Sequence, residues 1–243
     1  MDISVVIPAY NEAANIEAFV TAFIQKLPGS TREVLREIII VENGSKDRCL
    51  EACQRLQNIF PTLVRVLSNQ RGSYGEAVKR GMMESQGTHV CVLECDVLDA
   101  DFLNGSAELF GAGKARFIVA SKRHPASADR RPLKRRVLTL VFNGILRVFT
   151  GYPGTDTHGL KSVDASLARR LCAQCITTDE IFQTEFVLLA WRQGIVIHEL
   201  PIHIRETRAT PLSIRRRFPM VIDTVRQLRK SLRRFPAGVY GQP

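Results

Sequence analysis

Two carboxylates separated by one residue, Glu94 and Asp96, follow an apolar run that ends at Leu93. Carboxylate oxygens are the ligands that Mg²⁺ and Mn²⁺ prefer, and these cations commonly bridge a protein to phosphate groups. Because residues i and i+2 of an extended strand point to the same side, we expect both side chains to reach one cation. Asp96 is the first choice as metal ligand and catalytic residue, and Glu94 is the second. The alternative is an acidic strand end without a ligand.

Two further apolar runs end in acidic or amide residues, at Pro8-Ala9-Tyr10-Asn11-Glu12 and at Glu42-Asn43-Gly44-Ser45. A tyrosine ring can lie against a base or a sugar, and a glutamate can accept hydrogen bonds from a base or a ribose. Each segment alone would be an ordinary turn. Three such motifs at one edge of a parallel sheet, however, suit a cation and a nucleotide diphosphate. The donor-binding residues predicted from these segments are Pro8, Tyr10, Glu12 and Glu42.

The segments between the motifs alternate between two patterns. Short β-branched runs predict buried strands, and apolar residues spaced three and four apart predict helices. The predicted strands cover residues 5–7, 37–41, 63–67, 89–93, 116–121 and 195–204. The predicted helices cover residues 13–27, 47–60, 74–85, 133–149, 178–192 and 218–235. This alternation predicts an α/β fold with a doubly wound sheet flanked by helices, in which ligands bind beyond the carboxyl ends of the strands.

Composition limits the class of protein. The chain has 243 residues, 45% of them hydrophobic, which is enough for one large α/β domain. It contains no run of about 18 apolar residues, and Met1 leads straight into a strand pattern. We therefore expect neither a membrane-spanning helix nor a secretory signal. The six scattered cysteines are typical of a reduced, cytoplasmic protein.

The formal net charge of +10 is concentrated in residues 114–136 and 205–234. A basic second half indicates an anionic partner, such as a phosphate, an anionic lipid or a nucleic acid. The predicted last helix carries basic residues beside an apolar stripe. It either lies on an anionic membrane surface or folds its stripe onto the domain.

A third segment that could contact a nucleotide is rich in small residues. Arg71 comes just before it, and Gly75, Ala77, Gly81 and Gly87 lie along it. Small residues let a helix approach a nucleotide or the sheet closely, and an arginine can neutralise phosphate. We therefore add Arg71 and Gly75 to the predicted donor site. A packing helix with glycine at its ends would explain the same spacing.

The order of these motifs resembles that of the inverting glycosyltransferases of family 2, which have the Rossmann-like GT-A fold. Residues 8–12 match the family form Pro-x-Tyr-Asn-Glu completely. Glu42-Asn43 stands where the family commonly has Asp-Asp, and Glu94-Cys95-Asp96 occupies the place of Asp-x-Asp, with glutamate replacing the first aspartate. The resemblance implies a hexosyltransferase that uses a nucleotide-diphosphate sugar and Mg²⁺ or Mn²⁺. It adds Cys95 to the donor-binding residues.

The second half resembles the polyprenyl-phosphate sugar synthases, which include the dolichyl-phosphate mannose and glucose synthases. The matching segments are residues 121–125, Arg135-Arg136, Asp156 to Lys161, Phe182 to Glu185, Glu199 to Ile202, and Arg208 with Ser213. The resemblance implies transfer of the sugar to a polyprenyl phosphate, and it places Asp156 and Glu185 with Asp96 among the catalytic residues. Neither the sugar nor the nucleotide is determined by these segments.

A lipid phosphate is already an anionic nucleophile, so its glycosylation needs no strong general base. Basic side chains would hold the acceptor phosphate and the leaving diphosphate. The predicted phosphate-binding residues are Arg123, Arg135, Arg136, Arg208 and Ser213. A solvated basic face is the alternative explanation for these arginines.

Two other functions fit the same motifs. One is a soluble family-2 transferase that glycosylates a hydroxyl of a small metabolite, with Asp179, Glu180 or Glu185 as general base. The other is a catalytically weakened relative that binds a nucleotide or a lipid, since Asn43 and Glu94 depart from the family pattern.

The expected domain organisation is a GT-A catalytic domain over residues 1–212, followed by a basic amphipathic helix and tail over residues 213–243. Residues 1–101 would form the nucleotide-binding half and residues 102–212 the acceptor-binding half. The expected partners are the nucleotide sugar, the acceptor and the cytosolic face of an anionic membrane, on which the protein would be peripheral. Nucleic acid is not an expected partner, and homo-oligomerisation stays open.

Replacing Asp96 by alanine is expected to abolish sugar transfer and the metal-dependent part of donor binding, because the strongest candidate ligand is removed. Calorimetric titration of the donor with and without Mn²⁺ measures this directly. Asp101→Ala removes a nearby carboxylate and serves as the control. If metal-dependent affinity persisted in the Asp96 variant, another residue would have to hold the cation.

Overall fold

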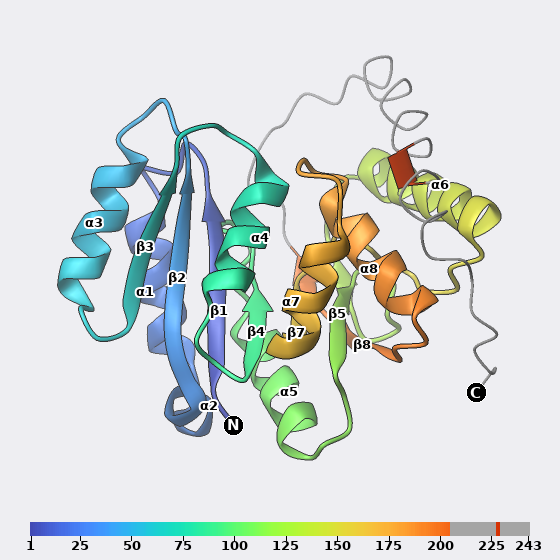
Figure 1. The fold of residues 1–243 in the computed structure, drawn as a ribbon, viewed down its shortest axis with the longest axis horizontal. Coiled ribbons are helices and arrows are strands. Elements are labelled where there is room, and N and C mark those ends of the chain that lie inside the picture. Colours follow the sequence, from blue (N-terminus) through green and yellow to red (C-terminus); the bar gives the residue numbers. More distant parts are fainter. Residues whose placement is uncertain (205–226, 229–243) are drawn as a thin grey trace.

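Seven strands form one mixed, mostly parallel sheet in the computed structural model, which describes residues 1–204 and 227–228 (Figure 1). In order across the sheet they are β3 (Val64–Asn69), β2 (Leu35–Asn43), β1 (Ile3–Ala9), β4 (His89–Val92), β7 (Lys161–Asp164), β5 (Phe117–Ser121) and β8 (Ile197–Pro201). All neighbouring strands are parallel except that β7 runs antiparallel to β4 and to β5. The predicted α/β class with a mostly parallel sheet is confirmed. A short second sheet pairs β6 (Ala128–Asp129) with β9 (His203–Ile204).

The central strands are continuously apolar because both faces of the sheet are covered. Every residue of β1 is buried, and successive side chains of a strand point to opposite faces. Val6 and Ile39 accordingly belong to one buried cluster, and Val5 and Ile38 belong to the other. The two clusters form the core on either side of the sheet.

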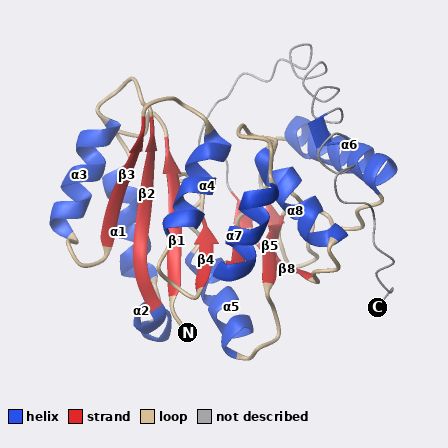
Figure 2. Ribbon diagram, viewed as in Figure 1, coloured by secondary structure: helices blue, strands red, loops and turns tan. Residues whose placement is uncertain are grey.

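Helices cover both of these faces (Figure 2). Those that contribute buried side chains to the cluster around Val5 are α1 (Ile16–Lys26), α3 (Cys49–Ile59) and α5 (Ala100–Gly111). Those that pack on the cluster around Val6 are α4 (Tyr74–Glu84), α7 (Ala165–Gln174) and α8 (Phe182–Arg192), together with one side of α6 (Leu133–Thr150), which is described below. The short helix α2 (Gly29–Val34) contacts α5, where Thr31 Oγ1 donates to Asn104 Oδ1 at 2.6 Å.

Five elements, α2, α5, β6, β7 and α7, lie where the sequence patterns predict none. The start of α5 is fixed by Asp99, whose carboxylate accepts a hydrogen bond from the Phe102 amide at 2.9 Å and so caps the helix. Strand β7 spans only four residues, Lys-Ser-Val-Asp. Such a short and largely polar segment shows no alternation that would distinguish it from a loop.

The predicted last helix lies outside the described residues, apart from Gln227 and Leu228, which are helical. Leu228 is buried and belongs to the cluster that also contains Leu146 and Tyr152. The phosphate-binding candidates Arg208 and Ser213 also lie outside the described residues. The predicted boundary between residues 212 and 213 stays a prediction.

Helix α6 (Leu133–Thr150) turns an apolar stripe away from the sheet and the helices that the structure describes. The stripe consists of side chains that are 47% to 81% exposed, at Leu133, Val137, Leu140, Val141 and Val148. The opposite side of the helix carries Phe142 and Leu146, which pack on the core. Exposed Lys134, Arg136 and Arg147 lie on either side of the stripe at helical spacing. We call this surface the α6 stripe.

The described part of the chain contains no helix that is long and apolar enough to cross a membrane.

Gly81 lies where α4 meets the sheet, and a Cβ added there would be 2.3 Å from Cγ1 of the buried Val6. We expect Gly81→Ala to lower the free energy of unfolding by about 1–3 kcal/mol, because the methyl group has no space. Gly144→Ala is the matched control, since its added carbon meets nothing within 4 Å beyond the backbone of its own helix turn. That change should raise the stability by about 0.5–1 kcal/mol through helix propensity. Urea unfolding of both variants measures this, and equal effects would contradict the close contact.

Candidate active site

The carboxyl ends of the parallel strands meet at one edge of the sheet, and the reversed strand β7 begins there. Ala9 pairs with Glu42 where β1 and β2 end. Lys161, the first residue of β7, pairs with Val92 at the end of β4 and with Val119 in β5. This edge therefore brings the acidic motifs of the first half together with a lysine of the second half. Open α/β sheets bind their ligands at this edge.

The buried carboxylate of Glu42 orders the turn that follows β2. Its two oxygens accept hydrogen bonds from the Ser45 amide at 2.6 Å and from Ser68 Oγ at 2.9 Å. Ser45 Oγ in turn accepts from the amide of Asn11, a residue with a positive φ of 55° in the turn after β1. The two turns are thereby linked. Each oxygen of Glu42 retains acceptor capacity for a ligand.

The other donor-binding candidates near these turns differ in exposure. Tyr10 and Arg71 are exposed, whereas Pro8 and Glu12 are buried. The Tyr10 ring lies beside Gly72, where an added Cβ would be 3.5 Å from Cε2. Tyr10 and Arg71 are therefore open to a ligand, while Pro8 and Glu12 lie within the structure that supports them. Their contact with a donor stays a prediction.

The acidic pair Glu94 and Asp96 does not lie on an extended strand. Strand β4 ends at Val92, and the Val97 amide donates to the Glu94 carbonyl at 2.8 Å, which closes a turn. Within this turn Glu94 is half-buried, Cys95 is buried in the core and Asp96 is exposed. The expectation that strand geometry directs both carboxylates the same way is therefore wrong. The contact of Cys95 with a donor stays a prediction.

Glu94 belongs to a hydrogen-bond network that joins four parts of the chain. Its Oε1 accepts from Tyr74 Oη and, at 3.0 Å, from Gln183 Nε2. Gln183 Oε1 accepts from Lys161 Nζ, which also donates to the Gly159 carbonyl at 2.7 Å. Lys161 is only 3% exposed. A buried ammonium is thus connected through one amide to the acidic motif.

Burial acts on each ionisable member of this network against its charged form. Desolvation raises the pKa of Glu94, although Tyr74, Lys161 and Gln183 oppose the rise. Desolvation lowers the pKa of Lys161 to about 7, although Glu94 and Asp156 favour its charged form. Burial also raises the pKa of Tyr74 well above its usual value, so Tyr74 remains a phenol donor. Lys161 and Glu94 therefore each stabilise the charge of the other.

A second polar cluster contains the catalytic candidate Asp156. Lys122 Nζ lies 2.8 Å from Asp156 Oδ2, and the His158 amide donates to Oδ1 at 2.9 Å. Burial alone would raise the pKa of Asp156, but the charge and hydrogen bond of Lys122 outweigh it and lower the pKa to about 2. A carboxylate with this pKa is a fixed negative charge at neutral pH and a weak general base. Its catalytic role stays a prediction.

The inner face of α6 packs on the segment that carries Asp156. Asn143 Nδ2 donates to the Thr155 carbonyl at 2.5 Å. The Phe142 ring meets the His158 ring edge-on, with centroids 5.1 Å apart. The helix that exposes the α6 stripe is therefore attached to the polar cluster by its opposite side.

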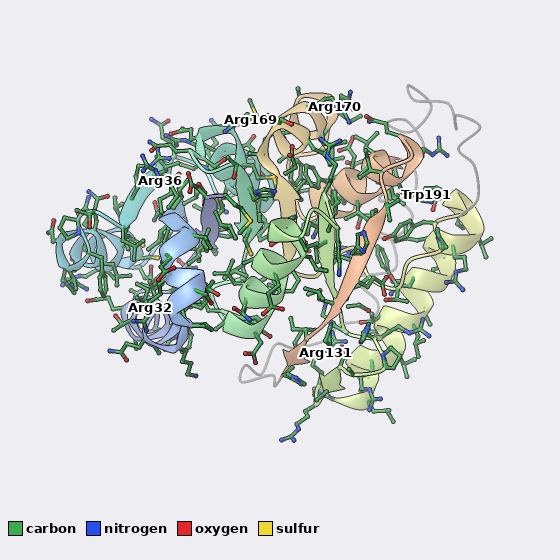
Figure 3. All side chains as sticks on the ribbon, turned by 90° about the horizontal axis from the view of Figure 1, so that it is seen from below. Arg32, Arg36, Arg131, Arg169, Arg170 and Trp191 are labelled. Carbon is green, nitrogen blue, oxygen red and sulfur yellow. The ribbon has the colours of Figure 1, made fainter. Side chains whose placement is uncertain are left out.

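Trp191 supports the C-terminal end of α6. Its ring meets Tyr152 edge-on at a centroid distance of 5.7 Å. Gly151 ends the helix with a φ of 77°, and a Cβ added there would be 3.5 Å from Trp191. Figure 3 shows Trp191 near this end of α6 and Arg131 near the other end. The helix is thus held against the domain at its end as well as through its inner face.

Gly75 approaches protein backbone closely. A Cβ added there would be 2.5 Å from the Thr178 carbonyl oxygen and 2.6 Å from Phe182 Cβ. The Glu76 amide donates to the same Thr178 carbonyl at 2.9 Å. The start of α4 therefore packs directly on the connection that leads into α8. This contact explains the glycine as a packing residue, and its contact with a donor stays a prediction.

Glu185 is completely buried in α8. Its carboxylate accepts hydrogen bonds from the backbone amides of Ile176 and Thr177, at 3.0 Å and 2.8 Å. These contacts hold the connection between α7 and α8. They assign Glu185 a structural task, whereas its role as general base stays a prediction.

The basic candidates of the second half are only partly described. Arg123 follows β5 and Arg136 lies on α6, and both are exposed. Arg135 also lies within α6. Their contact with phosphate stays a prediction.

Four side chains at the centre of these clusters were not assigned by the motifs: Tyr74, Lys122, Lys161 and Gln183. Each stands beside or within a segment that the motifs do single out, such as Lys122 before Arg123 and Gln183 before Glu185. What distinguishes them is burial of a polar or charged group, which sequence periodicity does not reveal.

Residues 4–162 match the profile of glycosyl transferase family 2, so the chain belongs to that family.

Three relatives are each 26% identical to this chain. Glycosyltransferase AglD of Haloferax volcanii aligns over 83% of this chain and 33% of its own length. The dolichyl-phosphate beta-glucosyltransferase of Saccharomyces cerevisiae aligns over 87% of this chain and 69% of its own. Dolichyl-phosphate beta-glucosyltransferase ALG5C of Trichomonas vaginalis aligns over 90% and 68%. This chain thus spans about a third of the archaeal relative and about two thirds of the other two.

Solved structures share the fold. Glucosyl-3-phosphoglycerate synthase from Mycobacterium tuberculosis, in complex with Mn²⁺, UDP-glucose and phosphoglyceric acid, superimposes with a TM-score of 0.71 at 19% identity, over 95% of this chain and 79% of that one. Its UDP complex gives a TM-score of 0.69 at 18% identity, with the same coverage. This likeness confirms the predicted GT-A fold.

The residues at the sheet edge fit a hard divalent cation that is shared with phosphate. Mg²⁺ is commonly held by one or two carboxylates together with substrate phosphates. Asp96 offers an exposed carboxylate. Glu94 retains Oε2, because its hydrogen bonds to described residues go to Oε1. Within the described residues there is no group of three or more acidic, histidine or cysteine side chains that could hold a metal.

Replacing Lys122 by methionine is expected to lower the free energy of unfolding at pH 7 by about 3 kcal/mol, because the buried Asp156 loses its partner. The folded pKa of Asp156 is about 2 and its ordinary value is 3.8, so its stabilising contribution is present above pH 3.8 and is lost as pH falls toward 2. The variant should therefore lose less stability than the parent protein between pH 5 and pH 2.

Urea unfolding at several pH values measures both effects. The double variant Lys122→Met/Asp156→Asn is the control, since it removes the unpaired charge and should recover part of the loss at pH 7. Identical acid profiles for the single variant and the parent protein would show that the pair does not depress the pKa of Asp156.

Proposed function

We propose that this chain transfers a sugar from a nucleotide-diphosphate sugar to a polyprenyl phosphate, with inversion at the anomeric carbon. An oxygen of the acceptor phosphate forms the new bond to the anomeric carbon while the bond to the diphosphate breaks on the opposite face. The nucleoside diphosphate leaves with the electron pair. Family membership supports sugar transfer, and the dolichyl-phosphate glucosyltransferases among the relatives support this class of acceptor.

The observation that carries the lipid acceptor is the position of α6. One side of this helix contacts the segment around Asp156 through Asn143 and Phe142. The other side exposes the α6 stripe between basic side chains. An apolar stripe with basic flanks suits the interface of an anionic membrane. On such a surface, the site would lie close to the headgroups of lipid acceptors.

The predicted nucleotide-binding half, residues 1–101, supplies groups suited to a nucleoside. Tyr10 presents an exposed ring, and the buried carboxylate of Glu42 is held in a fixed orientation by the turn. A fixed acceptor costs little entropy when it binds a ribose or base donor. Arg71, exposed beside this turn, would neutralise phosphate charge.

The predicted acceptor-binding half, residues 102–212, supplies positive charge. Lys122 and Lys161 lie at the ends of β5 and β7 on the same edge. Arg123, directly after Lys122, and Arg136, on α6, are exposed. In the proposed reaction the arginines hold the acceptor phosphate, since a guanidinium can bind phosphate through two hydrogen bonds. No general base is needed, because the acceptor already carries its negative charge.

Asp96 and Oε2 of Glu94 would hold Mg²⁺ or Mn²⁺. When bound, the cation neutralises the diphosphate and makes it a better leaving group. The chain itself contributes the turn of residues 94–97 that exposes Asp96, and the hydrogen bonds that hold Glu94.

A rival function, transfer of the sugar to a small metabolite, fits a specific observation. The UDP-glucose-bound neighbour with the same fold is a synthase crystallised with phosphoglyceric acid, a small metabolite. A comparable metabolite acceptor for this chain would require a general base, for which Asp179, Glu180 and Glu185 remain the candidates. The experiment below separates the two acceptor classes.

Val148→Glu, a change in the α6 stripe, is expected to weaken binding to vesicles that contain phosphatidylglycerol by about tenfold, because an apolar contact is lost and a negative charge is added. Transfer to a long-chain polyprenyl phosphate in the same vesicles should fall with it. Transfer to a short water-soluble prenyl phosphate should be unchanged, since the chemistry is untouched.

Val196→Glu is the matched control, because Val196 is 69% exposed but lies before β8 and outside the stripe. Vesicle binding by the parent protein should also weaken with added salt. A protein that ignored vesicles and prenyl phosphates yet glycosylated a hydroxyl of a small metabolite would refute the lipid acceptor.

A further inference from the structure

We propose that Lys161 and Gln183 are positioning residues for the donor site: Lys161 sets the orientation of the Gln183 amide, and that amide holds Glu94 in place. This inference rests on the proposed function only in requiring a nucleotide-diphosphate donor. Both residues would therefore support the acidic motif Glu94-Cys95-Asp96, although they come from the second half of the chain.

The direction of the Gln183 amide follows from the chemistry of its neighbours. Lys161 Nζ donates to the amide oxygen of Gln183, so the amide nitrogen points the other way. That nitrogen donates to Glu94 Oε1 at 3.0 Å and also contacts Tyr74 Oη. Lys161 is itself fixed by its bond to the Gly159 carbonyl at 2.7 Å. The Gly159 carbonyl thus fixes Lys161, Lys161 fixes the Gln183 amide, and that amide fixes the Glu94 carboxylate.

Glu94 requires such support for a local reason. It lies in a turn rather than on a strand, and its side chain has one more rotatable bond than aspartate. Each bond left free costs conformational entropy when a ligand fixes it. Two hydrogen bonds to Oε1 remove that freedom and leave Oε2 for the donor or its cation.

The network depends on close contact between α4 and the connection into α8. Gly75 allows this contact, since a Cβ there would be 2.5 Å from the Thr178 carbonyl oxygen. The contact sets Tyr74, the neighbour of Gly75, beside Gln183. Lys161 reaches the same place because β7 is paired between β4 and β5. The folding of the second half thereby determines the geometry of the donor site.

The test measures the affinity of UDP and of GDP, each with Mn²⁺, by calorimetric titration without any acceptor. Lys161→Met and Gln183→Leu should each weaken the better-bound nucleotide by about tenfold. Because the two residues act in series, the double variant should be no more than about twofold weaker than either single variant. A general loss of packing would instead give effects that add. All titrations are made well below the melting temperature of each variant.

Matched controls make the same chemical changes outside the network. Lys79→Met removes a lysine of α4 that donates to the Cys175 carbonyl at 3.4 Å. Gln193→Leu removes a glutamine that follows α8 and donates to Gln174 at 2.6 Å. Neither should change nucleotide affinity.

Unchanged affinity in both single variants, or losses that add in the double variant, would overturn the proposal. A parent protein that bound neither nucleotide would overturn it as well, since a carboxylate held for a donor needs one to bind. Failure of transfer to lipid alone would contradict the proposed acceptor and leave this inference standing, because the titrations contain no acceptor.

Discussion

The reversed direction of β7 is the constraint on which the site depends. A parallel strand in that position would end at the site edge, whereas β7 begins there, with Lys161 as its first residue. A buried ammonium is costly unless it is paired and hydrogen-bonded. The Gly159 carbonyl and the Gln183 amide supply the hydrogen bonds, and the charges of Glu94 and Asp156 favour the ammonium form. The bond to Gln183 also ties the position of α8 to that of the sheet. Through Gln183 the same network extends to Glu94, in the turn that follows β4.

The polar groups at the ligand-binding edge of the sheet both stabilise the fold and shape the surface that a ligand meets. Glu42 closes the turn after β2, and Asp156 compensates Lys122 while accepting a backbone amide. Such groups are already oriented before a ligand arrives, so they need little reorganisation when it binds. The same hydrogen bonds that stabilise the fold therefore shape the surface that a ligand meets.

Sequence patterns predict the parts of this fold in which burial is continuous. Strands β1 and β2 are covered on both faces, so their β-branched runs stand out, and the acidic motifs that follow them are correctly placed at one edge. The turn at residues 94–97 is not predictable from the same pattern, because apolar character continues one residue beyond the end of β4 at Val92. Strand direction is equally absent from periodicity, and this is why β7 and the role of Lys161 emerge only in three dimensions. The motifs alone bring the candidate residues to one edge of the sheet, but they could not say which carboxylates are engaged within the protein.

Helix α6 is apolar toward the outside along one stripe and bound to the Asp156 segment along the other side. A helix of this kind, lying flat on a bilayer, would limit the search for an acceptor to lateral diffusion in two dimensions. The rate of transfer would then follow the mole fraction of acceptor in the membrane, and diluting the vesicles at constant lipid composition would change it little once the protein is bound. Adding inert lipid, in contrast, would slow the reaction by spreading the same acceptor over a larger surface.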